Sequence, residues 1–209
     1  KNIKFLRKTK VMALSEAKIR KELKKAFKKA RELNNDKPRY SKASIAQFIA
    51  DAISVYVTDA EIQIFIPSTL LTTTPTPTVG IPDIASSGQR LKVVDTQSGK
   101  APLASTINFS FIAMDVGMVS VTPALVAYAA TLMSFKNLPG TITATGASIM
   151  TIPPVLAPAF AIGATGGSED SVIRTMSTII HTSFKSTLFT GIGNNIAPPA
   201  TGPAVGTLM

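Results

Sequence analysis

The sequence contains no cysteine, no tryptophan and a single histidine, and these absences exclude several classes of protein. Without cysteine the chain can form no disulfide framework, thiolate zinc site or iron–sulfur cluster, and it has no thiol nucleophile. Charged residues make up 16% of the chain, against about 25% in an average soluble domain. The usual parts of hydrolytic and metal chemistry are scarce, so we expect no enzymatic activity, no cofactor and no metal.

The positive charge of the chain is concentrated at one end of the sequence. The chain has 209 residues, 45% of them hydrophobic, which is enough for a core within one or two domains, and its net charge is +10. Residues 1–40 hold 15 of the 22 Lys and Arg and only four acids, a net charge of +11. Residues 41–209 hold the other seven basic residues and eight acids, a net charge of −1. The basic character therefore belongs to the first 40 residues.

The pattern between Leu14 and Leu33 predicts a basic amphipathic helix. Apolar residues recur there at three- and four-residue spacing, Ser15 is a candidate N-cap, and residues 34–38 supply a stop that ends in proline. Residues 1–11 are expected to form a flexible basic arm. The sides of the helix away from its apolar stripe are predicted to contact a partner or phosphate groups, through Lys18, Arg20, Lys21, Lys24, Lys25, Lys28, Lys29 and Arg31.

A basic amphipathic helix of this kind is compatible with three functions. It can lie on the phosphates of a nucleic acid, lie on an anionic membrane surface, or dock its apolar stripe on a partner protein. A solvated helix that packs on its own domain is the structural alternative. The sequence contains no helix-turn-helix, zinc finger or aromatic stacking platform, so sequence-specific DNA binding has the least support.

A helix–strand pattern recurs three times after Ser41. Each copy has a predicted helix, an alternating or β-branched strand, and a stretch rich in proline and glycine. The predicted helices begin near residue 41, at Thr122-Pro123, where Thr122 is a candidate N-cap, and at Ser168, which is another. The two acids that follow Ser168 suit the positive end of a helix dipole. The predicted strands lie at 61–66, 141–146 and 187–190. The stretches rich in proline and glycine lie at 72–81, 153–163 and 191–206.

These patterns predict an α+β fold of three short helix–strand units with Pro/Gly-rich extended arms, preceded by the basic helix. One helix and one strand bury too little apolar area to fold alone, so the units should stack on one another or on copies in other chains, which favours a homo-oligomer. The arms should run as polyproline-like segments over a neighbour's surface, because proline cannot hold a central position in a sheet. The predicted parts are residues 1–40, 41–81, 82–117, 118–165 and 166–209, and the insert at 82–117 contains two strand-like runs, 91–94 and 106–112.

The sequence shows no arrangement that would carry a reaction. His181 lies on a predicted helix without a carboxylate at helical spacing, which favours a structural or surface role over that of a general base. The glycine-rich stretch 163–168 lacks the Lys-Ser/Thr ending of a P-loop and 191–195 lacks a following helix, so both are predicted to be caps and turns. The two close pairs of acids are expected to be solvated ends of elements: Asp59 with Glu61, and Glu169 with Asp170.

Two uncharged runs raise the question of a membrane span. Residues 116–135 are long enough to cross a bilayer, but the helix start at Thr122-Pro123 leaves only about thirteen helical residues. Residues 137–168 contain four prolines, which exclude a continuous helix. We therefore expect a buried core helix and no contact with a membrane interior.

The chain after Ser41 resembles the small structural proteins of tailed bacteriophage virions, from the neck, tail or baseplate. The resemblance is carried by the preceding basic helix, the body rich in Thr, Ala, Gly and Pro, and the C-terminal stretch at 191–199. It includes no diagnostic motif, so no functional residue is carried over. It implies a non-enzymatic building block of the virion, which forms a homo-oligomeric ring or shell and docks other virion proteins through extended arms.

In this hypothesis the helix at 14–33 anchors the protein to an acidic partner surface or to packaged DNA. The second hypothesis is a nucleic-acid-associated protein that binds phosphates without sequence preference through residues 1–40, while its body only oligomerises. The third is a membrane-surface protein, which would bind anionic lipid through the same helix.

Overall fold

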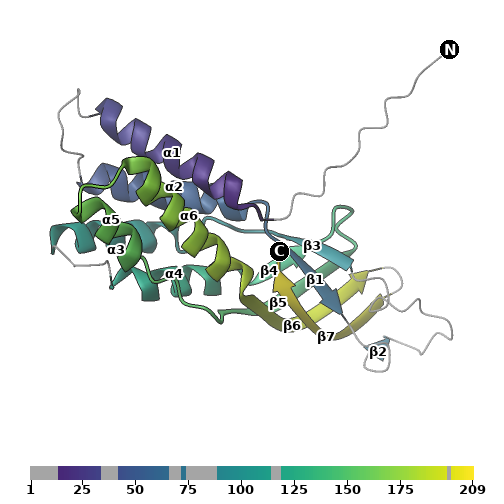
Figure 1. The fold of residues 1–209 in the computed structure, drawn as a ribbon. Helices are drawn as coiled ribbons and strands as arrows, with labels where there is room; N and C mark the ends of the chain where they lie inside the picture. Colours follow the sequence, from purple (N-terminus) through teal and green to yellow (C-terminus); the bar gives the residue numbers. More distant parts are fainter. Residues whose placement is uncertain (1–13, 34–41, 66–71, 74–88, 114–118, 197–198) are drawn as a thin grey trace, which may run out of the picture.

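The computed structural model describes residues 14–33, 42–65, 72–73, 89–113, 119–196 and 199–209 (Figure 1). The helices are α1 (Glu16–Leu33), α2 (Lys42–Val57), α3 (Lys100–Ile112), α4 (Val121–Ala130), α5 (Ala157–Ala164) and α6 (Glu169–Lys185). The strands are β1 (Glu61–Phe65), β2 (Thr72–Thr73), β3 (Gln89–Val93), β4 (Ser134–Lys136), β5 (Ile142–Met150), β6 (Thr187–Ile196) and β7 (Pro199–Leu208). The α+β class predicted from the sequence is confirmed.

The strands form one antiparallel sheet that closes on itself. Its order is β1-β3-β4-β5-β6-β7, and β1 also pairs with β7, with Ile62 opposite Leu208, while β2 adds to the free half of β7. Figure 1 shows the helices gathered on one side of the molecule and this barrel on the other, with α6 running directly into β6. Closure removes the open edges on which a β-sheet would otherwise pair with foreign strands.

The buried side of the barrel combines small residues of β5, β6 and β7 with large aliphatic residues, such as Ile62 and Leu91, and a pair of aromatic rings. Along β7 the buried and exposed positions alternate strictly from Thr201 to Leu208, as expected for a strand with one face inward. The rings of Phe135 and Phe189 meet edge to face with their centroids 5.1 Å apart. Gly146 of β5 lies opposite Gly191 of β6, where the two backbones approach more closely than a side chain would allow.

The helices of the three predicted units pack on one another within one chain. Tyr56 of α2 and Tyr128 of α4 both meet Phe184 of α6 edge to face, at centroid distances of 6.0 and 6.2 Å. All three side chains are buried, and the Tyr128 hydroxyl donates to the backbone oxygen of Thr96 over 2.6 Å. The apolar faces of these helices therefore receive their cover inside the chain and do not require a second copy.

Several predicted elements are present, with small shifts at their ends. The predicted basic helix is α1, the first unit corresponds to α2 and β1, and the predicted strand at 91–94 is β3. The hydroxyl of Ser168 accepts from the backbone N–H of Ser171 over 3.2 Å, so the predicted N-cap of α6 is confirmed. Thr122 was expected to be an N-cap, but it lies in the first turn of α4, and its hydroxyl donates to the Pro154 oxygen over 2.8 Å.

The prediction of a strand at 106–112 is wrong, because these residues form the second half of α3. The buried positions of α3 are Leu103, Ala104, Ile107 and Ser110, which recur at three- and four-residue spacing as in a helix with one covered face. Alternating apolar residues at 107, 109 and 111 fit the period of a strand equally well. Packing of α3 on α2 decides in favour of the helix.

The prediction of an extended C-terminal arm over a neighbouring chain is also corrected. The glycine-rich stretch at 191–195 lies inside β6, and residues 199–208 form β7, which pairs with β6 from Pro199 to Thr207. Pro203 is tolerated there because it faces the gap between the described pairings of β7 with β2 at 200–201 and with β1 at 205–208. The second predicted arm contains α5, whereas residues 1–11, 34–38 and 74–81 lie outside the described residues.

Candidate interaction surface

The helix α1 is fixed to the body of the protein through its apolar stripe. Its buried residues are Ile19, Leu23, Ala26 and Ala30, which pack against α2 and α6. The three- and four-residue spacing of these residues places them on one face, so burying that face orients all the other side chains of the helix. The apolar stripe of α1 is therefore not available for a partner.

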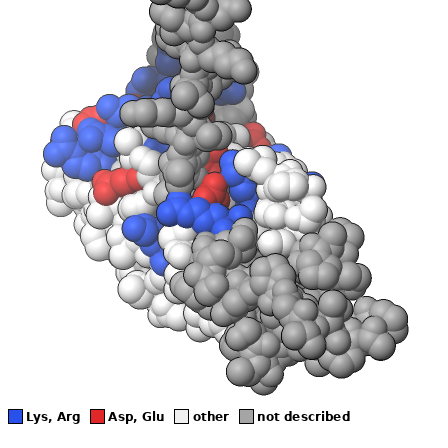
Figure 2. All heavy atoms as spheres, turned by 90° about the vertical axis from the view of Figure 1, so that its right-hand side faces the viewer, with Lys and Arg blue, Asp and Glu red and all other residues white. Residues whose placement is uncertain are grey.

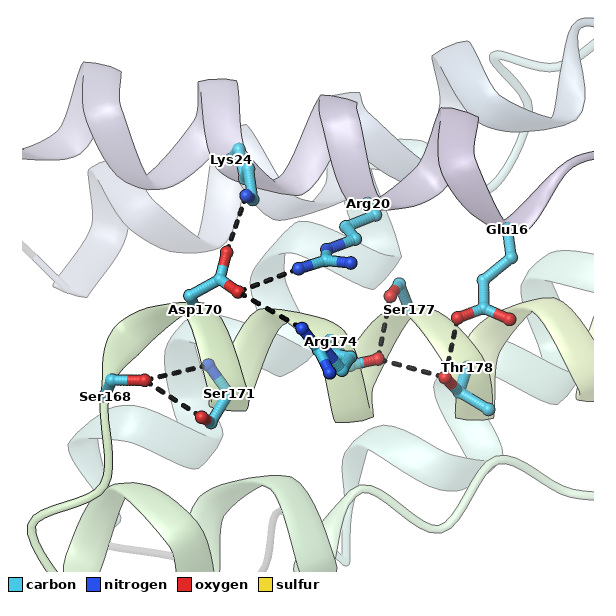
Figure 3. Close-up of polar contacts among 9 residues, drawn as sticks. All are labelled: Glu16, Arg20, Lys24, Ser168, Asp170, Ser171, Arg174, Ser177 and Thr178. Atoms are coloured by element: carbon cyan, nitrogen blue, oxygen red, sulfur yellow. Dashed lines mark hydrogen bonds and ion pairs between the residues drawn. The ribbon is translucent and has the colours of Figure 1, made fainter.

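A ladder of polar contacts joins α1 to α6, which runs antiparallel to it (Figure 3). The Thr178 hydroxyl donates to Glu16 over 2.8 Å at one end of the ladder. At the other end, Asp170 accepts from Arg20 over 2.7 Å and from Lys24 over 2.5 Å. The hydrogen bond from Lys24 is the main reason that the pKa of Asp170 lies below its usual value, and the charge of Arg20 lowers it further.

Two further cations of α1 are also held by acids from distant parts of the chain. Arg31 contacts Glu169 over 2.5 Å, and Lys18 contacts Asp59 over 2.7 Å while donating to the Thr58 hydroxyl over 3.1 Å. Together with Arg20 and Lys24, half of the predicted contact residues are therefore used to mount α1 on its own protein. The sequence predicts solvated ends of elements for the two close pairs of acids, whereas in the structure Asp59, Glu169 and Asp170 receive these cations.

The remaining four cations of α1 point away from the other helices or contact them weakly. Lys25 pairs with Glu22 over 2.7 Å and Lys28 with Glu32 over 3.7 Å, both within the helix, and Lys29 lies 5.9 Å from the centre of the Phe48 ring. Lys21 has no ion pair with any residue that the structure describes. Exposed pairs within a helix contribute only about 0.3–0.5 kcal/mol, so these cations are readily drawn to another anion.

Three of these cations define a continuous outward row. Lys21, Lys25 and Lys28 are spaced by four and three residues, which places them on one side of α1, and we call them the outer lysine row. They line an open hollow of about 830 Å³ together with Ala17, the paired cations Arg20 and Lys24, and one acid, Glu16. On the face shown in Figure 2, basic side chains gather in separate groups with acidic side chains between them. The outer lysine row is the candidate site for a negatively charged partner.

No family model, curated protein or solved structure matches this chain.

The remaining candidate residues have structural surroundings. Among the described residues, no group of three or more His, Asp and Glu side chains is placed to hold a metal ion. Gly166, with φ of +81°, and Gly167 form the turn between α5 and α6, and the Gly167 N–H donates to the Ile162 oxygen over 2.8 Å.

No described helix combines the length and the apolar character needed to cross a membrane. Glu61 is nearly buried at the seam of the barrel, 3.7 Å from Lys92 and 3.9 Å from Arg90.

His181 links α6 to α2 through a single hydrogen bond. Its Nδ1 lies 2.8 Å from the Tyr56 hydroxyl, and their rings meet edge to face. Burial, reinforced by the charge of Lys185, lowers the pKa of His181, whereas Glu16 acts in the opposite direction. Burial also raises the pKa of Tyr56, so the phenol stays protonated and can donate to the imidazole. This geometry suits a structural histidine.

We expect acidification to weaken the fold through His181. In the unfolded chain His181 binds a proton at its ordinary pKa of about 6.5, and in the folded protein it does so only at a lower pH. The contribution of His181 to the free energy of unfolding is therefore fully present above pH 6.5 and is lost as the pH falls through the pKa of the folded protein. Because the ring is partly exposed, the loss should stay below about 1 kcal/mol. Urea unfolding of the wild type and of His181→Gln between pH 7.5 and about 5 measures it. As the sequence has one histidine, a slope that persists in the variant would contradict this assignment.

Proposed function

We propose that this protein is a non-enzymatic structural protein of a phage-like virion, which assembles with copies of itself and docks other virion proteins. The supporting observation is that the cations of α1 fall into two groups with different contacts. Four cations fasten the helix to its own body, and the outer lysine row is left facing outward on a rigid support. A rigid row of cations binds an acidic partner surface at a smaller entropic cost than a flexible basic arm does.

The outer lysine row also suits a nucleic acid, which is the second candidate partner. A helix rises about 1.5 Å per residue, so Lys21 and Lys28 lie about 10 Å apart, along a line that a phosphate backbone can follow. The same geometry gives less support to a membrane-surface role. An interfacial helix inserts its apolar stripe into lipid, and the stripe of α1 is already buried against α2 and α6.

Reversing two charges of the outer row should weaken binding to acidic probes. We expect Lys21→Glu with Lys28→Glu to lower the affinity for a polyglutamate peptide about tenfold, because exposed ion pairs are each worth up to about 1 kcal/mol. Fluorescence anisotropy at low and physiological salt measures the affinity, with duplex DNA as the parallel probe. Stronger binding to DNA than to polyglutamate, with a steep salt dependence shared by unrelated DNA sequences, would favour the second candidate.

The matched control moves the same charge change to another part of the molecule. Lys136 and Lys185 are exposed, lie outside α1, and their replacement by Glu changes the net charge by the same amount. This control variant should bind the probes only slightly less tightly than the wild type. Equal losses in the two double variants would show that net charge, rather than the outer lysine row, attracts the partner.

A further inference from the structure

The outer face of three barrel strands forms a wall without charge. The outward residues are alternate positions at 143–149 in β5, 188–194 in β6 and 201–207 in β7, four on each strand, and none is Asp, Glu, Lys or Arg. We call these twelve positions the β5–β6–β7 wall. Three large apolar side chains are exposed on it: Ile149 by 57%, Ile192 by 56% and Val205 by 48%. Lys136 of β4 lies opposite Thr143 of β5 and marks one corner of the wall.

The side chains of the wall are already rigid before any partner arrives. Eight of the twelve are Val, Ile or Thr, whose branched Cβ restricts χ1, and two more are Pro203 and Ala147, which have almost no rotamer freedom to lose. Docking on this surface therefore costs little side-chain entropy. The barrel is closed, so a partner must pack face to face on the wall, as two sheets do at about 10 Å, rather than pair with an edge strand.

Charge favours a second copy of the chain as the occupant. Copies that each carry a net charge of +10 repel one another. The electrostatic repulsion is smallest when they approach through a face that has no charge. A charged partner surface would lose its hydration on this wall and gain no opposite charge in return. An uncharged partner surface has no charged groups whose hydration would be lost. The wall of a second copy is such a surface, and a twofold axis would bring the two walls together.

From these observations we propose that the β5–β6–β7 wall is the centre of a homotypic interface, in which two copies pack their walls face to face. The proposal rests on the self-assembly included in the proposed function and names its contact surface. With strands about 4.8 Å apart and outward residues about 6.8 Å apart, the wall covers about 400 Å² per copy, half of a standard interface. A single contact of this size is weak, which suits an assembly built from repeated contacts.

The test introduces a charge at the centre of the wall. Analytical ultracentrifugation of the full chain at about 100 µM detects a dimer whose Kd is tens of micromolar or lower. We expect Ile192→Lys to raise the dimer Kd at least about 100-fold, because the symmetric contact would desolvate two like charges. The matched control is Ile112→Lys on α3, since Ile112 is exposed by 59%, and it should dimerise like the wild type. Circular dichroism melts verify that both variants are folded.

A crosslinking experiment gives an independent readout. The chain has no cysteine, so Thr190→Cys in the middle of the wall should be joined into dimers by a short bis-maleimide reagent, and Ile112→Cys should not. If the wild type remains a monomer at this concentration, both the interface and the proposed self-assembly are wrong. If it assembles but Ile192→Lys and Thr190→Cys behave like their Ile112 controls, the wall is the wrong surface and self-assembly stands.

Discussion

Replacing Gly146 with alanine is expected to destabilise the protein by at least about 3 kcal/mol, a large part of the stability of a typical domain. The added Cβ would overlap the backbone oxygen of Thr190 and the Cα of Gly191 on the paired strand. The contact is reciprocal, because a Cβ on Gly191 would overlap the Thr145 oxygen and lie 2.7 Å from the Cα of Gly146. These obstacles are backbone atoms of a strand paired on both sides, so no side chain can move aside to relieve them.

Chemical denaturation measures this loss, with a second glycine as the control. A Cβ on Gly163, near the end of α5, would meet only the Cγ2 of Val172, at an ordinary 3.6 Å. Gly163→Ala should therefore leave the free energy of unfolding unchanged or raise it by up to about 1 kcal/mol through helix propensity. If Gly146→Ala were as stable as Gly163→Ala, the close approach of the β5 and β6 backbones at Gly146 and Gly191 would be wrong.

The same pair of glycines explains why the barrel could not be predicted from the sequence. Glycine and proline are read as breakers of regular structure, so residues 191–206 pointed to an arm instead of two strands. In the structure these residues belong to β6 and β7, and the absence of side chains at Gly146 and Gly191 lets the paired backbones of β5 and β6 approach closely. That contact joins residues 45 positions apart, and no local pattern in the sequence announces it.

Local periodicity of the sequence is sufficient to predict an element when one face of that element is buried and the other is charged. It identified α1, whose apolar stripe and cations are segregated, and it placed the start of α6 at Ser168. It failed for α3, which is uncharged after Lys100 and has apolar residues on all sides. In such an element the alternation at 107–111 is compatible with either period, and only tertiary packing selects one.

The candidate site was predicted in part for the same reason. The eight cations of α1 are visible in the sequence. Which of them hold α1 on its own protein and which form the outer lysine row depends on acids that lie far away in the sequence. Asp170 lies 150 residues from Arg20, and Asp59 lies beyond the end of α2. One signal was available: Glu169 and Asp170 form one of only two close pairs of acids after residue 40, whereas residues 1–40 hold fifteen basic residues and only four acids. That imbalance could have suggested an internal ion pair.

Phe184→Ala is expected to destabilise the protein by about 3 to 5 kcal/mol, since it removes a large side chain from a closed core. Phe184 is fully buried and stands edge to face between Tyr56 and Tyr128, with interplanar angles of 82° and 72°. Its ring is thus the contact through which α2, α4 and α6 meet. The buried tyrosines cannot collapse freely into the cavity, because their hydroxyls are bonded to His181 and to the Thr96 backbone.

The matched control for this prediction is a phenylalanine on the surface. Phe109 of α3 is exposed by 62%, so Phe109→Ala should change the free energy of unfolding by no more than about 0.5 kcal/mol. Urea denaturation of both variants gives the comparison, and the slope of the transition shows whether unfolding remains cooperative. A cost at Phe184 no larger than that at Phe109 would mean that the three helices do not share one core. The helix–strand units would then need cover from another chain, which is the second of the two alternatives that the sequence left open.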